Sequence, residues 1–169
     1  MAGVHLRPAR SDDLAFIMAT ERMPGYERMV GRSPEEQHRA ALTLTDCAYL
    51  LGIDAAGERA AFAIVRDLAD AQGNVCLLRL AVAMPDRGVG GRFLREVLRW
   101  VFAESMAYRL WLAVMPGNAR AHHVYASHGF VDEGVMRSAY RLLDGSRTDL
   151  GLMSLLRPDW LAHPRATNE

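Results

Sequence analysis

The spacing of apolar and polar positions changes sharply near the middle of the chain. Residues 75–82 are apolar except for Arg79, which is typical of a buried strand. A loop with Pro85 and three glycines follows it. Apolar residues then recur at 89, 93, 94, 97, 98, 101 and 102, the spacing of a helix with one buried face. The pattern predicts strand, tight loop and helix in succession.

Five elements are predicted before this unit. They are a strand over residues 4–9, a helix capped by Ser11, a helix that opens with a capping box at 33–36 and runs to about 44, and strands over 48–54 and 60–67. A loop at residues 23–31, with Pro24 and two glycines, separates the two helices. Helices and strands therefore alternate, as in an α/β protein.

The C-terminal third continues the alternation. Residues 109–115 predict a buried strand parallel to the preceding one, and Asn118 is expected to cap a helix that runs to residue 128. Strands are predicted over residues 130–135 and about 148–156. The sequence contains no repeats and no linker, so we predict one domain over residues 1–160 with a mixed sheet. The segment from Arg157 onward is expected to be loosely held, with residues 161–169 as a tail.

Composition and charge exclude several classes of protein. The 169 residues carry a formal net charge of zero, without a basic run, so no nucleic-acid partner is expected. No apolar run approaches the roughly 18 residues of a membrane span, and no signal peptide is visible, so we expect a cytoplasmic protein without a membrane partner. Cys47 and Cys76 lack metal or redox spacing, which favours inert thiols over a disulfide or a reactive thiol.

The glycines Gly88, Gly90 and Gly91 lie where the long helix is predicted to begin. First-turn N–H groups have no partner within the helix, and glycine lets a ligand approach the main chain, so this turn is expected to bind phosphate. All 20 basic residues are arginine, which excludes a nucleotide loop of the GK[ST] type. A dinucleotide fingerprint fails as well, because Phe93 stands at its third glycine.

These residues resemble the coenzyme A loop of the GNAT family of N-acetyltransferases, Q/R-x-x-G-x-G/A. Two registers are available. In one, Gly88 and Gly90 are the paired glycines and Pro85 stands where the family prefers a basic residue; in the other, Arg87-x-x-Gly90 fits and Arg92 departs from the final small residue. The apolar positions of the helix favour the first register. Arg87 is then an additional phosphate contact.

A second motif agrees with this resemblance. Asn118, Ala121, Tyr125, Gly129 and Phe130 follow the pattern N-x-x-A-x-x-x-Y-x-x-x-G-F of the same family. The two motifs occur in the family's order, and residues 144–160 resemble the branch that includes ribosomal-protein N-terminal and spermidine acetyltransferases. The resemblance implies a single α/β domain whose mixed, largely antiparallel sheet contains a splayed parallel strand pair and is flanked by helices. It also implies acetyl-CoA as cofactor.

The resemblance further implies roles for individual residues. Main-chain groups of Leu80, Ala81 and Val82 would bind the pantetheine arm and the thioester. The turn would hold the pyrophosphate through Arg87, Gly88, Val89, Gly90 and Gly91. Asn118 would bond to pantetheine, and Tyr125, otherwise a buried aromatic residue, would protonate the coenzyme A sulfur.

A general base and a metal site are less well marked. Glu21 lies where family members bring side chains to the substrate and is the candidate base, against the simpler interpretation of a solvated helix-end charge. Tyr26, Met29 and Met115 are candidate pocket residues. The histidines of residues 122–128 lack the i, i+4 spacing of metal ligands, so no metal is expected.

The expected activity is transfer of acetyl from acetyl-CoA to a primary amine of a small molecule or a protein N-terminus, by direct attack in a ternary complex. The alternative is a non-catalytic acyl-CoA-binding regulatory module, and transfer of a longer acyl group stays open. A homodimer also stays open, because family members often pair through sheet edges. The sequence does not select the acceptor.

Overall fold

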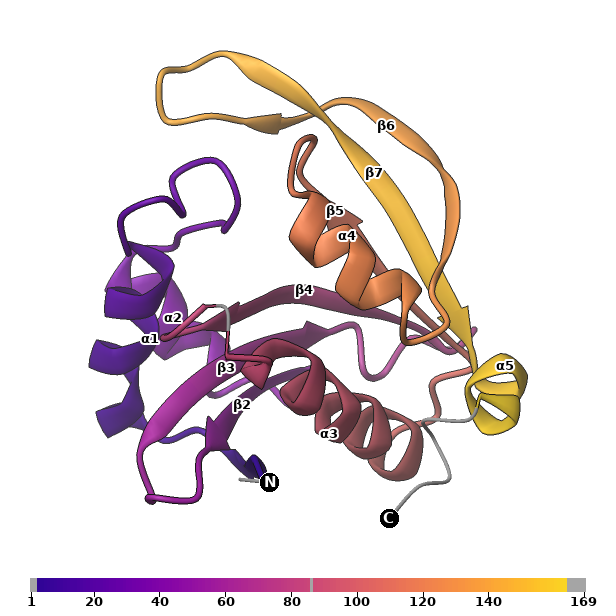
Figure 1. Cartoon of the computed structure of the whole chain (residues 1–169), viewed down its shortest axis with the longest axis horizontal. Coiled ribbons are helices and arrows are strands. Elements are labelled where there is room, and N and C mark those ends of the chain that lie inside the picture. Colours follow the sequence, from indigo (N-terminus) through magenta and orange to yellow (C-terminus); the bar gives the residue numbers. More distant parts are fainter. Residues whose placement is uncertain (1–2, 86, 164–169) are drawn as a thin grey trace.

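The protein folds around one mixed sheet, seen in a computed structural model that describes residues 3–85 and 87–163 (Figure 1). The strands in this part of the chain are β1 (His5–Pro8), β2 (Cys47–Ile53), β3 (Arg59–Arg66), β4 (Asn74–Val82), β5 (Arg109–Val114), β6 (Val131–Arg141) and β7 (Arg147–Leu156). Their order is β1-β2-β3-β4-β5-β7-β6, and every neighbouring pair is antiparallel except β4 and β5. The predicted α/β fold is confirmed.

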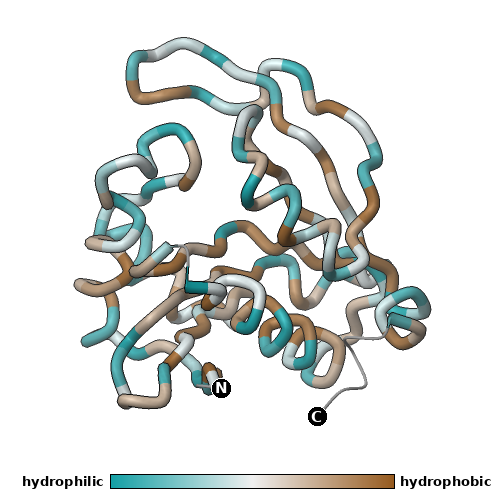
Figure 2. Tube along the Cα trace, viewed as in Figure 1, coloured by the Kyte–Doolittle hydropathy of each residue, from teal (hydrophilic) through white to brown (hydrophobic). Residues whose placement is uncertain are grey.

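Helices cover both faces of the sheet. They are a 3-10 turn η1 (Ser11–Asp13), α1 (Leu14–Glu21), α2 (Glu35–Ala41), α3 (Val89–Glu104), α4 (Ala119–Ala126) and α5 (Arg157–Ala162). One core joins α3 and α4 to the sheet, and a second core lies under α1 and α2 on the opposite face. Figure 2 shows brown apolar segments along the strands between these layers.

The long helix α3 confirms the predicted helical pattern. Its buried positions are Val89, Phe93, Leu94, Val97, Leu98, Val101 and Phe102. Phe93 is fully buried and reaches β2 at Gly52, where an added Cβ would lie 2.7 Å from the Phe93 ring. The helix therefore rests on a strand position that only glycine fills without displacement.

The parallel pair β4–β5 is short and then opens into a wedge. The two strands pair only from Asn74 to Cys76 on β4 and from Arg109 to Trp111 on β5. Beyond these residues β4 stays paired with β3, and β5 stays paired with β7. This arrangement confirms the splayed pair that the resemblance implied. A bulge at Leu78 interrupts β4 near the point of divergence, because consecutive residues of β3 pair with Leu77 and Arg79.

The starts of the first two helices differ from the predictions. Ser11 lies inside η1, and Asp13 occupies the N-cap position of α1 while its carboxylate binds Arg7 and Arg59. At α2 the predicted capping box is wrong, because the N-cap is Pro34 and no side chain caps the helix. The backbone N–H of Ser33 instead donates to Glu21, far away in sequence.

The C-terminal segment is also more ordered than predicted. Strand β6 continues to Arg141 with two irregularities in its register, and α5 forms from Arg157 with a proline in its first turn. Trp160 of α5 stacks on Phe102 with ring centroids 4.9 Å apart, and the Arg157 guanidinium donates to three carbonyls near the end of α3. The domain end at residue 160 stays a prediction. Residues 164–169 of the expected tail lie outside the described residues.

We expect Gly52→Ala to lower the free energy of unfolding by about 1–3 kcal/mol, because the new methyl group meets the Phe93 ring in a packed core. Urea denaturation of the wild-type and variant proteins measures this loss. Gly3→Ala is the control, since a Cβ there meets no atom within 4 Å. Equal stability of Gly52→Ala and wild type would contradict the packing described.

Candidate active site

The open edge of β4 is the first part of the site. The N–H of Ala83 donates to β3, and residues of a strand alternate in the side to which their N–H and C=O groups point, so Ala81 also faces β3. Leu80 and Val82 therefore turn their main-chain groups toward the wedge. The Tyr26 hydroxyl donates to the Val82 carbonyl over 2.8 Å, which agrees with this orientation. Of the three predicted residues, Leu80 and Val82 are placed to bind a ligand through the main chain.

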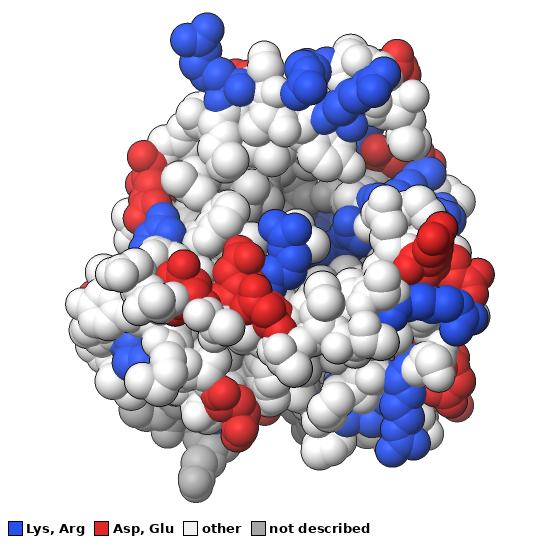
Figure 3. All heavy atoms as spheres, turned by 180° about the vertical axis from the view of Figure 1, so that it is seen from behind, with Lys and Arg blue, Asp and Glu red and all other residues white. Residues whose placement is uncertain are grey.

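The wedge corresponds to a hollow in the molecular surface. Seen from behind, the molecule is hollowed between the β6–β7 hairpin and the sheet (Figure 3). In Figure 1 the α1–α2 loop, residues 22–34, lies below the tip of the β6–β7 hairpin. A ligand in the wedge would thus meet the sheet below, the hairpin above and this loop at one side.

The glycine turn lies at the end of β4, beside the wedge. Gly88 is the N-cap of α3 with φ 67°, a left-handed conformation that favours glycine. A Cβ on Gly90 would lie 3.6 Å from the Val82 side chain, so the turn and the open edge are adjacent. The first-turn N–H groups from Val89 to Gly91 have no carbonyl partner within the helix. They are available to an anion such as a diphosphate.

Arginines lie beside this turn. Arg87 is exposed, as a phosphate contact requires. The Arg92 guanidinium folds back and donates to the Arg87 carbonyl over 3.0 Å, and its Nη1 lies 3.2 Å from the position of a Cβ on Gly88. No role in binding was predicted for Arg92. Its contact with the turn makes it a second candidate for binding phosphate.

Helix α4 carries the other two predicted residues. Asn118 caps the helix as predicted, and its Oδ1 accepts from the N–H of Ala121 over 3.2 Å. Tyr125 is buried against Phe130, with ring centroids 5.6 Å apart. Burial raises the pKa of Tyr125 to about 12, so the phenol keeps its proton at neutral pH. Its hydroxyl makes no hydrogen bond to any described residue and stays available to a ligand.

His128 connects the two helices of the site and was not predicted to have a role there. It is 4% exposed, with Nε2 2.9 Å from the Gly91 carbonyl at the start of α3 and Nδ1 2.8 Å from the Val124 carbonyl. Carbonyl oxygens only accept, so the ring nitrogen that carries the hydrogen donates to the carbonyl beside it, and Nδ1 also lies 3.3 Å from the Ser127 hydroxyl. His128 thereby ties the Tyr125 helix to the glycine turn. No local pattern of residues indicates this contact, because it joins residues 37 positions apart.

Glu21 is neither solvated nor free. Its carboxylate is fully buried at the end of α1. Oε1 accepts from Arg22, from the N–H of Ser33 and lies 3.2 Å from His38 Nε2, while Oε2 accepts from Arg79 over 2.7 Å. The interpretation as a solvated helix-end charge is wrong. The role of general base stays a prediction, and these surroundings are those of a residue that positions others.

The partners of Glu21 fix the α1–α2 loop on the sheet. Arg22 donates to the Ser33 carbonyl over 2.7 Å, which closes the loop across its base. A Cβ on Gly31 would lie 2.9 Å from Arg79 Nη2, so the loop backbone rests on the guanidinium of β4. Arg79 lies two residues before Ala81, at the wedge. Glu21 therefore determines where the loop meets the ligand-binding edge.

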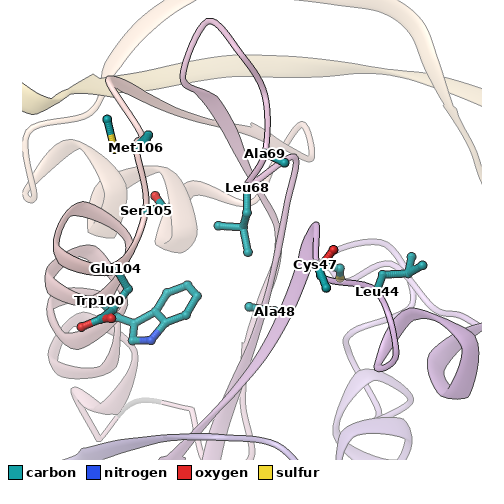
Figure 4. A pocket seen from close by; sticks show the side chains of 10 residues that line it. Leu44, Cys47, Ala48, Leu68, Ala69, Trp100, Glu104, Ser105 and Met106 are labelled. Carbon is teal, nitrogen blue, oxygen red and sulfur yellow. The ribbon is translucent and has the colours of Figure 1, made fainter.

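A separate cleft of about 540 Å³ lies far from these residues (Figure 4). It is lined by Trp100, Glu104, Ser105 and Met106 near the end of α3, and by residues of β2 and its neighbouring loops. None of the predicted site residues contributes to it. Cys47 lines this cleft as a free thiol whose pKa is raised by burial, and burial raises the pKa of the free thiol of Cys76 to about 11.

No group of three or more histidine, cysteine or acidic side chains in residues 3–85 and 87–163 is arranged to hold a metal ion. No helix in these ranges is long and apolar enough to cross a membrane.

Comparison with known proteins adds a family and a set of similar folds. The model of the acetyltransferase (GNAT) family matches residues 16–130. A variant of the spermidine N-acetyltransferase SpeG from Vibrio cholerae superposes with a TM-score of 0.81 at 18% identity, over 94% of this chain and 96% of that one. The complex of the Vibrio cholerae enzyme with CoA and spermine gives 0.80 at 17% identity, over 94% and 98%. A GNAT acetyltransferase from Streptococcus pneumoniae gives 0.72 at 22% identity, over 90% and 99%. At these identities the structural likeness shows the fold.

We expect His128→Leu to weaken binding of CoA by about tenfold, because the buried Gly91 carbonyl loses a partner worth about 1–3 kcal/mol and the turn shifts. Binding of pantetheine, which lacks the phosphates, should change little. Isothermal titration measures both. His123→Leu, at an exposed position on the same helix, is the control. Equal losses for CoA and pantetheine would indicate a general structural defect instead.

We expect Glu21→Gln to destabilise the fold by about 3–5 kcal/mol, because Arg79 keeps a buried charge without its counter-ion. The double variant with Arg79→Met should recover part of this loss. Glu35→Gln, which breaks only an exposed pair with Arg39, is the control and should cost about 0.5 kcal/mol or less. Unchanged stability with a hundredfold loss of turnover would instead support the general-base prediction.

Proposed function

Because the chain belongs to the acetyltransferase (GNAT) family, we propose that it transfers acetyl from acetyl-CoA to a primary amine by direct attack in a ternary complex. The family's enzymes are acetyl-CoA-dependent N-acetyltransferases, so acetyl-CoA is the donor. The acceptor is a small-molecule amine or a protein N-terminus. The observation that carries the proposal is the wedge between β4 and β5, with the glycine turn and Tyr125 on the helices beside it.

The donor site is proposed to be mostly main chain. The pyrophosphate lies on the N–H groups of the turn from Gly88 to Gly91, with Arg87 and Arg92 as additional cationic contacts. The pantetheine arm follows the open edge of β4, where Leu80 and Val82 supply main-chain donors and acceptors. The amide of Asn118 binds the arm from the other side, because its Oδ1 already caps α4 and its Nδ2 is left to donate.

The chemical step needs a proton for the departing thiolate. The amine attacks the thioester carbonyl, the carbon–sulfur bond breaks, and the sulfur takes the proton of the Tyr125 hydroxyl. A phenol with a pKa near 12 is fully protonated at neutral pH and so is ready to donate. An N–H group at the open edge of β4 stabilises the negative charge that develops on the carbonyl oxygen.

The attacking amine must lose its own proton, and Glu21 is the candidate base from the sequence. Its four partners argue that it acts instead by placing the α1–α2 loop, so we propose that the amine's proton passes to solvent in the hollow. A homodimer and the absence of nucleic-acid and membrane partners stay predictions.

The competing proposal is a non-catalytic acyl-CoA-binding module. Such a protein has no use for a protonated tyrosine beside the coenzyme A sulfur, so the surroundings of Tyr125 favour an enzyme. Thiol release from acetyl-CoA against a panel of peptides, polyamines, aminoglycosides and amino acids separates the two. Release with one class supports an enzyme; tight acetyl-CoA binding without release supports the module; no binding contradicts both.

We expect Tyr125→Phe to lower turnover by about a hundredfold, because the thiolate loses its acid, with little change in acetyl-CoA affinity. With the pKa of Tyr125 near 12, the wild-type rate should not fall through loss of this proton below about pH 10. Assays of thiol release at a series of pH values measure both effects. Tyr108→Phe, on the exposed surface, is the control. Full turnover by Tyr125→Phe would falsify the acid role.

A further inference from the structure

Two segments with charged side chains border the hollow, and together we call them the rim. The rim consists of the α1–α2 loop, residues 22–34, and the β6–β7 hairpin from Arg137 to Asp149. Its loop touches the wedge through the hydrogen bond of Tyr26 to Val82. Its two halves approach each other, since hydrogen bonds from Ser146 and the charge of Arg28 lower the pKa of Asp144. An acceptor that reaches the wedge must pass this rim.

The rim is positively charged although the whole chain is neutral. It contains six arginines, Arg22, Arg28, Arg32, Arg137, Arg141 and Arg147, against three carboxylates, Glu27, Asp144 and Asp149. Two of these carboxylates are already engaged within the hairpin. Asp144 accepts from Ser146, and Asp149 accepts from the N–H of Ser138 over 2.7 Å. Figure 3 shows basic side chains on the hairpin, and both basic and acidic side chains on the sheet side of the hollow.

The carboxylate of Glu21 does not offset the positive charge of the rim. Glu21 lies at the loop's base, and its carboxylate is fully buried and paired with Arg22 and Arg79. Two guanidinium groups therefore face one carboxylate there. A ligand amine finds no free negative charge at Glu21.

Arg32 is the rim residue whose guanidinium has the strongest need of an anionic partner. It is half-buried, its Nε is buried without a hydrogen-bond partner, and it forms no ion pair or hydrogen bond with any described residue. A guanidinium that has lost part of its hydration without gaining a partner is unfavourable. A carboxylate satisfies it with short, charge-assisted hydrogen bonds.

We propose that the amine acceptor carries a carboxylate, which the rim binds through Arg32 while the amine enters the wedge. The acceptor is thus of the amino-acid class rather than a polyamine. This inference rests on the proposed acetyl transfer and adds the substrate class. The net charge of the rim repels a polycation and attracts a carboxylate over several ångströms.

The fold shared with spermidine N-acetyltransferases does not decide the acceptor. The sheet and the glycine turn meet the donor, whereas the acceptor meets side chains of the rim. Proteins with one fold commonly differ in such side chains and hence in substrate.

The test compares acceptors of matched length: 4-aminobutyrate, which ends in a carboxylate; putrescine, which ends in a second amine; and neutral butylamine. We expect kcat/KM to be about tenfold higher for 4-aminobutyrate than for butylamine, the value of one charge-assisted contact, and lowest for putrescine. Raising the salt concentration should reduce the difference. A kcat/KM for putrescine or butylamine equal to or above that for 4-aminobutyrate overturns the inference.

Arg32→Gln tests the residue. We expect it to lower kcat/KM for 4-aminobutyrate by about tenfold and to leave that for butylamine unchanged, because only the carboxylate contact is lost. Arg99→Gln, on the outer side of α3, is the matched control and should alter neither value. Equal loss for both acceptors with Arg32→Gln contradicts a carboxylate-binding role.

Failure of this inference is distinguishable from failure of the proposed function. If no amine is acetylated, binding of the same three amines to the protein saturated with acetyl-CoA is measured by titration. Absence of acetyl-CoA binding contradicts the proposed function. Binding of acetyl-CoA together with tighter or equal binding of putrescine overturns the carboxylate inference alone, and tighter binding of 4-aminobutyrate supports it.

Discussion

One buried negative charge, that of Glu21, governs how the acceptor side of this protein is built. A carboxylate removed from water must be paired and hydrogen-bonded, or it neutralises or unfolds its surroundings. Glu21 meets this requirement with Arg79 from the sheet, Arg22 and Ser33 from the two ends of a loop, and His38 from α2. The loop is therefore held against β4 by these charged contacts, in addition to the packing of Tyr26 and Val30 on the second core.

The donor side is built on a different principle. There the divergence of β4 and β5 exposes main-chain groups, and the left-handed Gly88 starts a helix whose first N–H groups are free. Main-chain groups are present whatever the side chains are, so the requirement on sequence is for small residues and apolar spacing. This explains why the turn, α3 and the cap at Asn118 could be predicted from the sequence. Their signals are local, confined to a few neighbouring residues.

The features that could not be predicted join residues distant in sequence. The capping box at residues 33–36 was a sound local pattern, but Glu21 took the Ser33 N–H that Glu36 was expected to bind. His128 meets Gly91 only because α3 and α4 pack on the same face of the sheet. Helix α5 forms because Trp160 stacks on Phe102 and Arg157 binds the end of α3. In each case a tertiary partner outweighed the local preference.

This difference bears on how far a family assignment reaches. The family identifies acetyl-CoA as donor. The proposed donor site consists mainly of main-chain groups, which depend on the fold rather than on individual side chains. The proposed acceptor site consists of side chains of a loop and a hairpin, which can change without disturbing the sheet. This chain has an excess of arginine on the rim. Its Glu21 carboxylate is fully engaged by its hydrogen-bond partners. Both features depend on side chains rather than on the fold. A polyamine needs free carboxylates at the entrance, and here the charges of the entrance have the opposite sign.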